Sequence, residues 1–247
     1  LVVGDILEDF DKLLLRRTFE FGPFDQLTQL GSGEADVILF TDTLEVETHK
    51  RLYNKEEIYA KEPATAEEIP AEQIQHNFNT NFFGPINVIK AVLPQMRKQQ
   101  SGLVINITSI AGYMGLPYRG IYSASKGALE ILTEAFRMET KDFGIKFTNI
   151  APGDFATNIA AGRYHAPLKQ DSPYAANYGK SLALMDEHVD HGEDPQKMGE
   201  AVLAIISEKE PAVHYKVGAY MQKISVFLKG VLPSKVYERL LLNHYKL

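Results

Sequence analysis

The 247-residue sequence contains no cysteine and no tryptophan. Without cysteine, the chain can form no disulfide bond, and it offers neither a thiolate metal ligand nor a thiol nucleophile. The absence of disulfides agrees with a reducing compartment, and we expect a cytoplasmic protein. No stretch approaches about 18 consecutive apolar residues, so the sequence predicts no transmembrane segment. The first residues also lack the pattern of a signal peptide.

Acidic residues and glycine are unevenly distributed along the chain. Residues 1–75 carry 17 Asp and Glu against 7 Lys and Arg, whereas residues 76–247 carry 15 against 19. Only four of the 18 glycines lie in the first 75 residues. Neither part contains a basic stripe interleaved with aromatic residues, so the sequence predicts no binding of nucleic acid.

Apolar runs that are typical of buried strands alternate with long amphipathic segments that are typical of helices. This alternation predicts an α/β fold, a doubly wound parallel sheet (Rossmann-like) in a single domain over residues 1–247. Pro85 and Pro94 should bend or restart the first long helix. The predicted strands are 2–3, 36–40, 103–107, 145–150 and 213–217, and the predicted helices are 5–17, 71–96, 122–143, which Gly144 should cap, and 195–206.

Two loops of this predicted fold should carry the chemistry. In open parallel sheets, ligands bind outside the carboxyl ends of the strands. Ser109 follows one predicted strand, and Pro152 ends the next. We therefore expect the functional residues in the loops that start at these two positions.

Four polar residues form a candidate catalytic constellation. Tyr122 and Lys126 are four residues apart near the start of a predicted helix, so they share one helix face. An ammonium group beside a phenol favours the phenolate, which allows tyrosine to act as a general acid or base. The loop after the preceding strand could fold the hydroxyl of Ser109 towards Tyr122. Asn81 lies inside the preceding helix, where an amide needs a water or a freed carbonyl as partner.

Each of these signals is weak alone, but their order and spacing are specific. From about Glu67 to Leu247 the sequence resembles the short-chain dehydrogenase/reductase family, and within it the steroid and retinol dehydrogenase-like branch. The stretches that carry the resemblance are Asn81-Phe-Phe-Gly84, Ile107-Thr-Ser-Ile110, Tyr122-Ser-Ala-Ser-Lys126 and Pro152-Gly-Asp-Phe-Ala-Thr157.

The resemblance implies a role for each residue of the constellation. Tyr122 would donate a proton in carbonyl reduction or accept it in alcohol oxidation. Lys126 would assist Tyr122 and hydrogen-bond the nicotinamide ribose of the cofactor. Ser109 would orient and polarise the substrate oxygen, and Asn81 would hold a water in the proton relay behind Lys126.

The resemblance also implies a dinucleotide cofactor, NAD or NADP. Pro152, Gly153 and Thr157 would line its nicotinamide end, together with Tyr122 and Lys126. We favour NADP slightly, since an Arg16-Arg17 pair would suit a 2′-phosphate, although the second strand that decides this choice cannot be placed. The sequence predicts no metal site.

Residues 1–66 depart from the family pattern. The family's glycine-rich turn, which holds the cofactor phosphates at a helix N-terminus, has no counterpart here, because Asp5-Ile-Leu-Glu-Asp9 follows Gly4. About 70 residues precede the helix that bears Asn81, where roughly 100 are expected. This segment is diverged, incomplete or misassigned, or it forms a different substructure; we favour an incomplete or misassigned sequence.

Three further segments have two interpretations each. We interpret His188-Val-Asp-His191 as a polar loop in preference to a metal site, because no third ligand accompanies it. Residues 158–190 form the predicted substrate segment. In the tail, residues 220–247, apolar residues alternate with lysines. We expect the tail to cover the core or a hydrophobic substrate entrance; the alternative is that it lies on a membrane surface.

The function predicted from the sequence is an NAD(P)-dependent oxidoreductase that interconverts a secondary alcohol and a ketone, with a hydrophobic small molecule as substrate. The alternative is a catalytically silent relative that acts as a binding or scaffold protein. The small residues of the Tyr122 helix allow close helix packing. The resemblance implies a homodimer or homotetramer formed through the two long helices.

Overall fold

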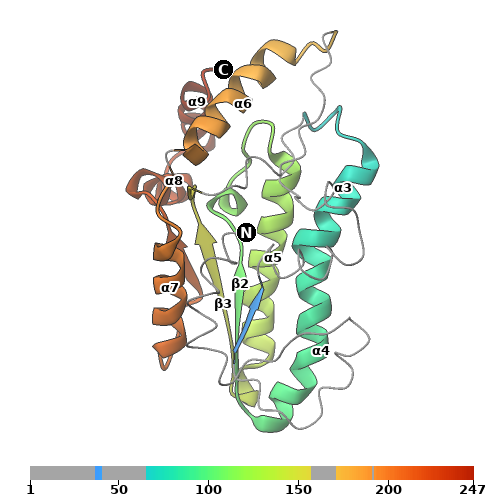
Figure 1. The fold of residues 1–247 in the computed structure, drawn as a ribbon, viewed down its shortest axis with the longest axis vertical. Helices are drawn as coiled ribbons and strands as arrows, with labels where there is room; N and C mark the ends of the chain where they lie inside the picture. The colour runs from blue at the N-terminus through green and yellow to red at the C-terminus, as the bar shows by residue number, and fades with distance from the viewer. Residues whose placement is uncertain (1–36, 41–64, 157–170, 191) are drawn as a thin grey trace.

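Parallel strands form the sheet of the computed structural model, which describes residues 37–40, 65–156, 171–190 and 192–247 (Figure 1). The strands β1 to β4 lie side by side in chain order, and every neighbouring pair is parallel. Their bounds are β1 (Val37–Phe40), β2 (Gly102–Ile107), β3 (Ile145–Pro152) and β4 (His214–Val217). The sheet confirms the predicted α/β fold.

The helices cover both faces of this sheet. Figure 1 shows α3, α4 and α5 on one face and α7 on the other, with α6, α8 and α9 at the end where the strand arrows point. Their bounds are α3 (Ala71–Phe78), α4 (Gly84–Gln99), α5 (Gly120–Glu139), α6 (Ala175–Asp190), α7 (Gln196–Ser207), α8 (Tyr220–Val231) and α9 (Ser234–His244). The sheet is therefore doubly wound, as predicted.

Side-chain alternation along β2 divides the core into two layers. Val104 faces the layer that contains Ile89 and Phe147, under α4 and α5. Its neighbours Leu103 and Ile105 face the opposite layer, formed with Val202 and Ile205 of α7, among other residues. Successive residues of a strand point to opposite faces, so an almost continuous apolar run fills both layers.

The predicted helix over 71–96 is interrupted where Asn81 lies. A π-helical turn, η2 (Asn79–Phe83), separates α3 from α4. Pro85 has no N–H, so it cannot donate the regular helical hydrogen bond to the carbonyl of Asn81. The expected disruption near Pro85 is confirmed, whereas Pro94 lies inside α4 without ending it.

Two further boundaries differ from the sequence prediction. The strand predicted to end at Ile150 continues to Pro152, because the ladder with β4 persists and Gly153 N donates to Val217 O at 2.7 Å. Residues 188–190 belong to α6, so the polar loop predicted there is wrong. The strand predicted at 2–3 and the helix predicted at 5–17 lie outside the described residues.

The segment that follows α5 ends as the glycine pattern predicts. After α5, a 3₁₀ turn, η4 (Lys141–Phe143), leads to Gly144, whose φ is 67°. A β-carbon at Gly144 would collide with the carbonyl of Gln100, so both the conformation and the space require glycine.

The C-terminal helices close the carboxyl end of the sheet. Tyr237 of α9 is buried with Ile110 and Met114, and residues of α8 such as Leu228 pack against the same cluster. The expectation that the tail covers the core is confirmed for this inner side. Among the described residues, no helix combines the length and the apolar character needed to cross a bilayer.

We expect Gly127→Ala to destabilise the fold by about 1–3 kcal/mol, because its added methyl group would lie 2.7 Å from the carbonyl oxygen of Gly112. Urea unfolding followed by circular dichroism measures this free energy. Gly120→Ala at the start of the same helix is the matched control, since no atom lies within 4 Å of its new β-carbon. Equal stabilities of the two variants would contradict the close backbone approach.

Candidate active site

Ser109 lies where the sequence predicts it, directly beyond the carboxyl end of β2. It caps the 3₁₀ turn η3 (Ile110–Tyr113), and its Oγ accepts a hydrogen bond of 3.1 Å from the N–H of Ala111. This turn packs against α5, the helix that carries Tyr122. The Ser109 hydroxyl is therefore fixed by a turn that rests on the Tyr122 helix.

Tyr122 and Lys126 share the face of α5 that points into the protein. Their exposed fractions are 4% and 1%. The Lys126 ammonium donates a hydrogen bond of 3.2 Å to the carbonyl of Ile107, and it lies 6.0 Å from the centroid of the Tyr122 ring. The last residue of β2 thus holds the lysine beside the tyrosine.

Asn81 is buried in the π-helical turn and is linked to the same part of α5. Its Nδ2 donates to Asn77 Oδ1 and to Ser125 Oγ, both at 3.2 Å. Ser125 Oγ in turn donates to the carbonyl of Tyr122 at 3.0 Å. The buried Oδ1 of Asn81 has no hydrogen-bond partner among the described residues. A buried amide oxygen of this kind suits a bound water or another donor.

Pro152 and Gly153 lie at the carboxyl end of β3, as predicted. Gln222 of α8 holds the following turn: its Nε2 donates to Asp154 Oδ2 at 2.6 Å, and its Oε1 accepts from the N–H of Asp154 at 3.2 Å. A β-carbon at Gly153 would collide with the Gln222 side chain. Thr157, the last residue expected here, lies outside the described residues.

A buried carboxylate stands behind this group of residues. Glu130 is 5% exposed, and its Oε1 accepts a hydrogen bond of 2.7 Å from the hydroxyl of Thr108, which immediately precedes Ser109. The hydroxyl of Tyr113, at the end of η3, also hydrogen-bonds Glu130 and lies 3.3 Å from His214 Nδ1. Glu130 therefore contacts the residues at both ends of the Ser109 turn.

Burial dominates the protonation of this carboxyl group. It raises the pKa of Glu130 from 4.5 to about 7, against the hydrogen bonds from Thr108 and Tyr113 and the charge of Lys216, which lower it. The nearby charge of Glu134 acts in the same direction as burial. Burial first, and the charge of Glu130 second, raise the pKa of Tyr113. The pair therefore holds protons more tightly than the free side chains do.

The comparisons with known proteins fit this geometry. Residues 58–167 match the family model described as short chain dehydrogenase. The chain belongs to the short-chain dehydrogenase/reductase family. It is 40% identical to the 3-ketodihydrosphingosine reductase of Bacteroides thetaiotaomicron over 168 residues, which are 68% of this chain and 62% of that protein. The chain spans less than two thirds of the length of the first curated relatives that it matches.

Solved short-chain dehydrogenases share the fold. One from Streptomyces avermitilis is similar with a TM-score of 0.63 and 25% identity, over 90% of this chain and 71% of that chain. Another, from Burkholderia cenocepacia in complex with NADP, gives a TM-score of 0.54 at 22% identity, over 72% and 63% of the two chains. These likenesses agree with the parallel sheet and its covering helices.

The described residues fit only one end of the dinucleotide that the family implies. Lys126 holds Tyr122 beside the carboxyl end of β2, and Gly153 follows β3, where the Gln222 side chain packs against it. This arrangement suits the nicotinamide and its ribose. The positions where the family carries its phosphate-binding glycines lie outside the described residues, and the sequence there lacks that motif.

Sequence reasoning missed Glu130, Thr108 and Tyr113. A signal for Glu130 was present, since it lies four residues after Lys126 and eight after Tyr122 and so shares their helix face. Thr108 and Tyr113 are brought to it by tertiary packing of the Ser109 turn. No spacing in a single sequence predicts this contact.

We expect Glu130→Gln to flatten the pH dependence of stability between about pH 4.5 and 7. In the wild type, the folded state keeps the Glu130 proton in this range while the unfolded state has released it. The contribution of Glu130 to the stability is therefore greatest below pH 4.5, and up to about 3 kcal/mol of it is lost as the pH rises through 7. Urea unfolding at several pH values between 4 and 8 measures the slope.

Glu134→Gln is the matched control for this experiment. Its side chain is about half exposed and contacts His214 Nε2 at 3.0 Å, so most of the wild-type slope should remain. An identical slope in Glu130→Gln and the wild type would show that Glu130 does not bind this proton.

Proposed function

We propose that this protein is an NAD(P)-dependent oxidoreductase that interconverts a secondary alcohol and a ketone. The observation that carries the proposal is the buried pair of Tyr122 and Lys126, whose ammonium is held on the Ile107 carbonyl two residues before Ser109. A phenol, a cation and a hydroxyl at the carboxyl ends of parallel strands are the groups needed to manage a proton beside a substrate oxygen.

In the reductive direction, the phenol of Tyr122 donates a proton to the substrate oxygen. The Ser109 Oγ already accepts the N–H of Ala111, so its own hydrogen is directed elsewhere and donates to the substrate carbonyl. The positive charge of Lys126 stabilises the negative charge that develops on the tyrosine oxygen as the proton leaves. In the oxidative direction, Tyr122 accepts the proton from the alcohol.

Asn81 completes the proposed proton path behind Lys126. Its buried Oδ1, which has no hydrogen-bond partner among the described residues, provides an acceptor inside the π-helical turn. A water bound there would return a proton towards Lys126 and Tyr122 after each turnover. The hydrogen bond from Asn81 to Ser125 holds this acceptor against α5.

A bound dinucleotide would supply or receive the hydride. Lys126 and Tyr122 would hydrogen-bond its nicotinamide ribose, and Pro152, Gly153 and Thr157 would line the nicotinamide end. Both NAD and NADP are compatible with these residues. We favour NADP on the basis of Arg16 and Arg17, which lie outside the described residues.

We propose a hydrophobic ketone or alcohol as the substrate. The relative with 40% identity is named as a 3-ketodihydrosphingosine reductase. The rings of Tyr118, in the loop before α5, and Tyr178, in the predicted substrate segment, lie 5.4 Å apart. Ser172 of this segment also donates to Glu68 at 3.0 Å. An aromatic segment held beside the loop before α5 suits an apolar substrate.

We also propose that the protein forms a homodimer or homotetramer through its two long helices. Ile131 and Met138 of α5 are 70% and 66% exposed, although α5 is otherwise a core helix. Covering these side chains with a second copy would remove apolar surface from water. The expected cytoplasmic location remains a prediction from the sequence.

We expect Tyr122→Phe to lower kcat by at least about 100-fold, because phenylalanine has no proton to transfer. NADPH consumption with 3-ketodihydrosphingosine as substrate measures the rate. Tyr215→Phe, at a partly exposed tyrosine that hydrogen-bonds Glu208 on the far side of the sheet, is the control and should retain the wild-type rate. Wild-type turnover by Tyr122→Phe would overturn the proposed role.

Dinucleotide binding distinguishes the enzyme from a catalytically silent relative. We expect wild type and Tyr122→Phe to bind NADPH with dissociation constants within about tenfold of each other, measured by fluorescence titration, because a phenol contributes only one hydrogen bond to the ribose. A folded full-length chain that binds neither NADH nor NADPH would contradict the enzyme proposal and favour a scaffold.

A further inference from the structure

Large apolar side chains are exposed mainly on the two C-terminal helices. Ten such residues are exposed in the described part of the chain, and seven of them lie between residues 220 and 242. Contiguous exposed apolar surface on a protein marks an interaction site. The seven residues, here called the apolar tail face, are Tyr220, Met221, Phe227, Val231, Val236, Leu240 and Leu242.

Helix α8 has two distinct apolar sides. On its inner side, Val226, Leu228 and Leu232 pack against the core cluster that contains Ile110 and Met114. On its outer side, Tyr220, Phe227 and Val231 follow one another at intervals of seven and four residues, with exposed fractions of 74%, 66% and 57%. The inner side is buried against the core, whereas the outer apolar side chains remain exposed and make no contribution to the core.

Basic residues surround this outer side. Residues 220–247 contain five Lys and Arg and one acidic residue, Glu238, whereas the remaining chain carries 21 Lys and Arg against 31 Asp and Glu. Lys223, Lys235, Arg239 and Lys246 are all exposed. The apolar tail face is thus embedded in positive charge on an otherwise acidic protein.

We infer that α8 and α9 dock this protein on the surface of a lipid bilayer that carries anionic headgroups. The apolar tail face enters the boundary between headgroups and acyl chains, and the lysines meet the negative surface. A symmetric contact between two copies fits less well, because a two-fold interface would bring two surfaces of the same net positive charge together. The lipid surface supplies the opposite charge that a second tail lacks.

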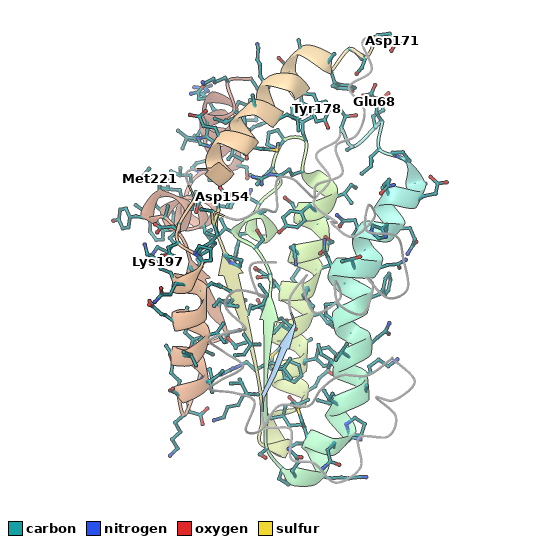
Figure 2. The ribbon with its side chains drawn as sticks, viewed as in Figure 1. Glu68, Asp154, Asp171, Tyr178, Lys197 and Met221 are labelled. Carbon is teal, nitrogen blue, oxygen red and sulfur yellow. The ribbon has the colours of Figure 1, made fainter. Side chains whose placement is uncertain are left out.

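The position of these helices connects the docking surface to the site. Figure 2 shows Met221 on the outside of the molecule close to Asp154, at the carboxyl end of β3. Gln222, the next residue, hydrogen-bonds Asp154, and Tyr245 accepts a hydrogen bond of 3.1 Å from Arg119, just before α5. A bilayer under α8 therefore lies near the carboxyl end of β3, where it would supply a lipid-like ketone; this last step rests on the proposed function.

Vesicle co-sedimentation tests the docking without any measurement of activity. We expect the full chain to sediment with vesicles of phosphatidylcholine and phosphatidylglycerol in equal parts, and at least about tenfold less with pure phosphatidylcholine. Raising the salt concentration from 0.05 to 0.5 M should weaken the binding, because salt screens the attraction of lysines to the surface.

Paired variants separate the two contributions. Phe227→Glu removes an apolar contact, and Lys223→Glu with Lys235→Glu reverses two charges; each should lower the vesicle-bound fraction by about tenfold or more. The matched charge control is Lys141→Glu with Lys209→Glu, at two exposed lysines that follow α5 and α7 and lie outside the tail. This control should bind vesicles as the wild type does, and circular dichroism checks that every variant is folded.

Three outcomes would overturn the inference. The first is a folded wild type that binds no anionic vesicles. The second is an equal loss of vesicle binding in the control variant and in the tail variants. The third is a wild type that does not bind vesicles but forms a dimer by light scattering, when Phe227→Glu abolishes that dimer; this result would assign the face to a second copy. NADPH titration in solution remains independent of all three, so failure of docking leaves the oxidoreductase proposal standing.

Discussion

The hydrogen bond between the Lys126 ammonium and the Ile107 carbonyl determines how the carboxyl end of the sheet is built. A charge that is 1% exposed is costly unless polar groups surround it. The carbonyl at the end of β2 and the neighbouring Tyr122 ring supply such surroundings. The helix and the strand must therefore remain in fixed register, and the tight approach of Gly127, the residue after Lys126, to Gly112 maintains it.

Two buried polar residues link α5 to the segments around the site. Asn81 reaches α5 from the π-helical turn through Ser125, while Glu130 reaches from α5 to Thr108 and Tyr113 beside Ser109. The Asn81 contact thus fixes α5 against the π-helical turn, and the Glu130 contacts fix α5 against the turn that carries Ser109. The same helix face carries Tyr122, Lys126 and Glu130, so a small rotation of α5 would disturb every functional group together.

The sequence predicted the sheet and most of the long helices because their signals are local. Alternating burial along 103–107 and the four-residue spacing from Tyr122 to Lys126 are properties of one strand and one helix. The π-helical turn was only partly predictable, since Pro85 marks the disruption but does not specify its geometry. The helical state of 188–190 and the contacts of Glu130 depend on packing between segments far apart in the sequence, which no local pattern contains.

The π-helical turn at Asn79–Phe83 makes the length of this segment functionally important. Removing one residue would restore regular α-helical hydrogen bonding, but α3 would then rotate by about 100° relative to α4. With α4 held in place, Asn77 of α3 would turn out of its buried position. Single-residue insertions and deletions here are therefore more damaging than most substitutions. The number of residues between α3 and α4 is constrained because it sets the rotation of one helix relative to the other.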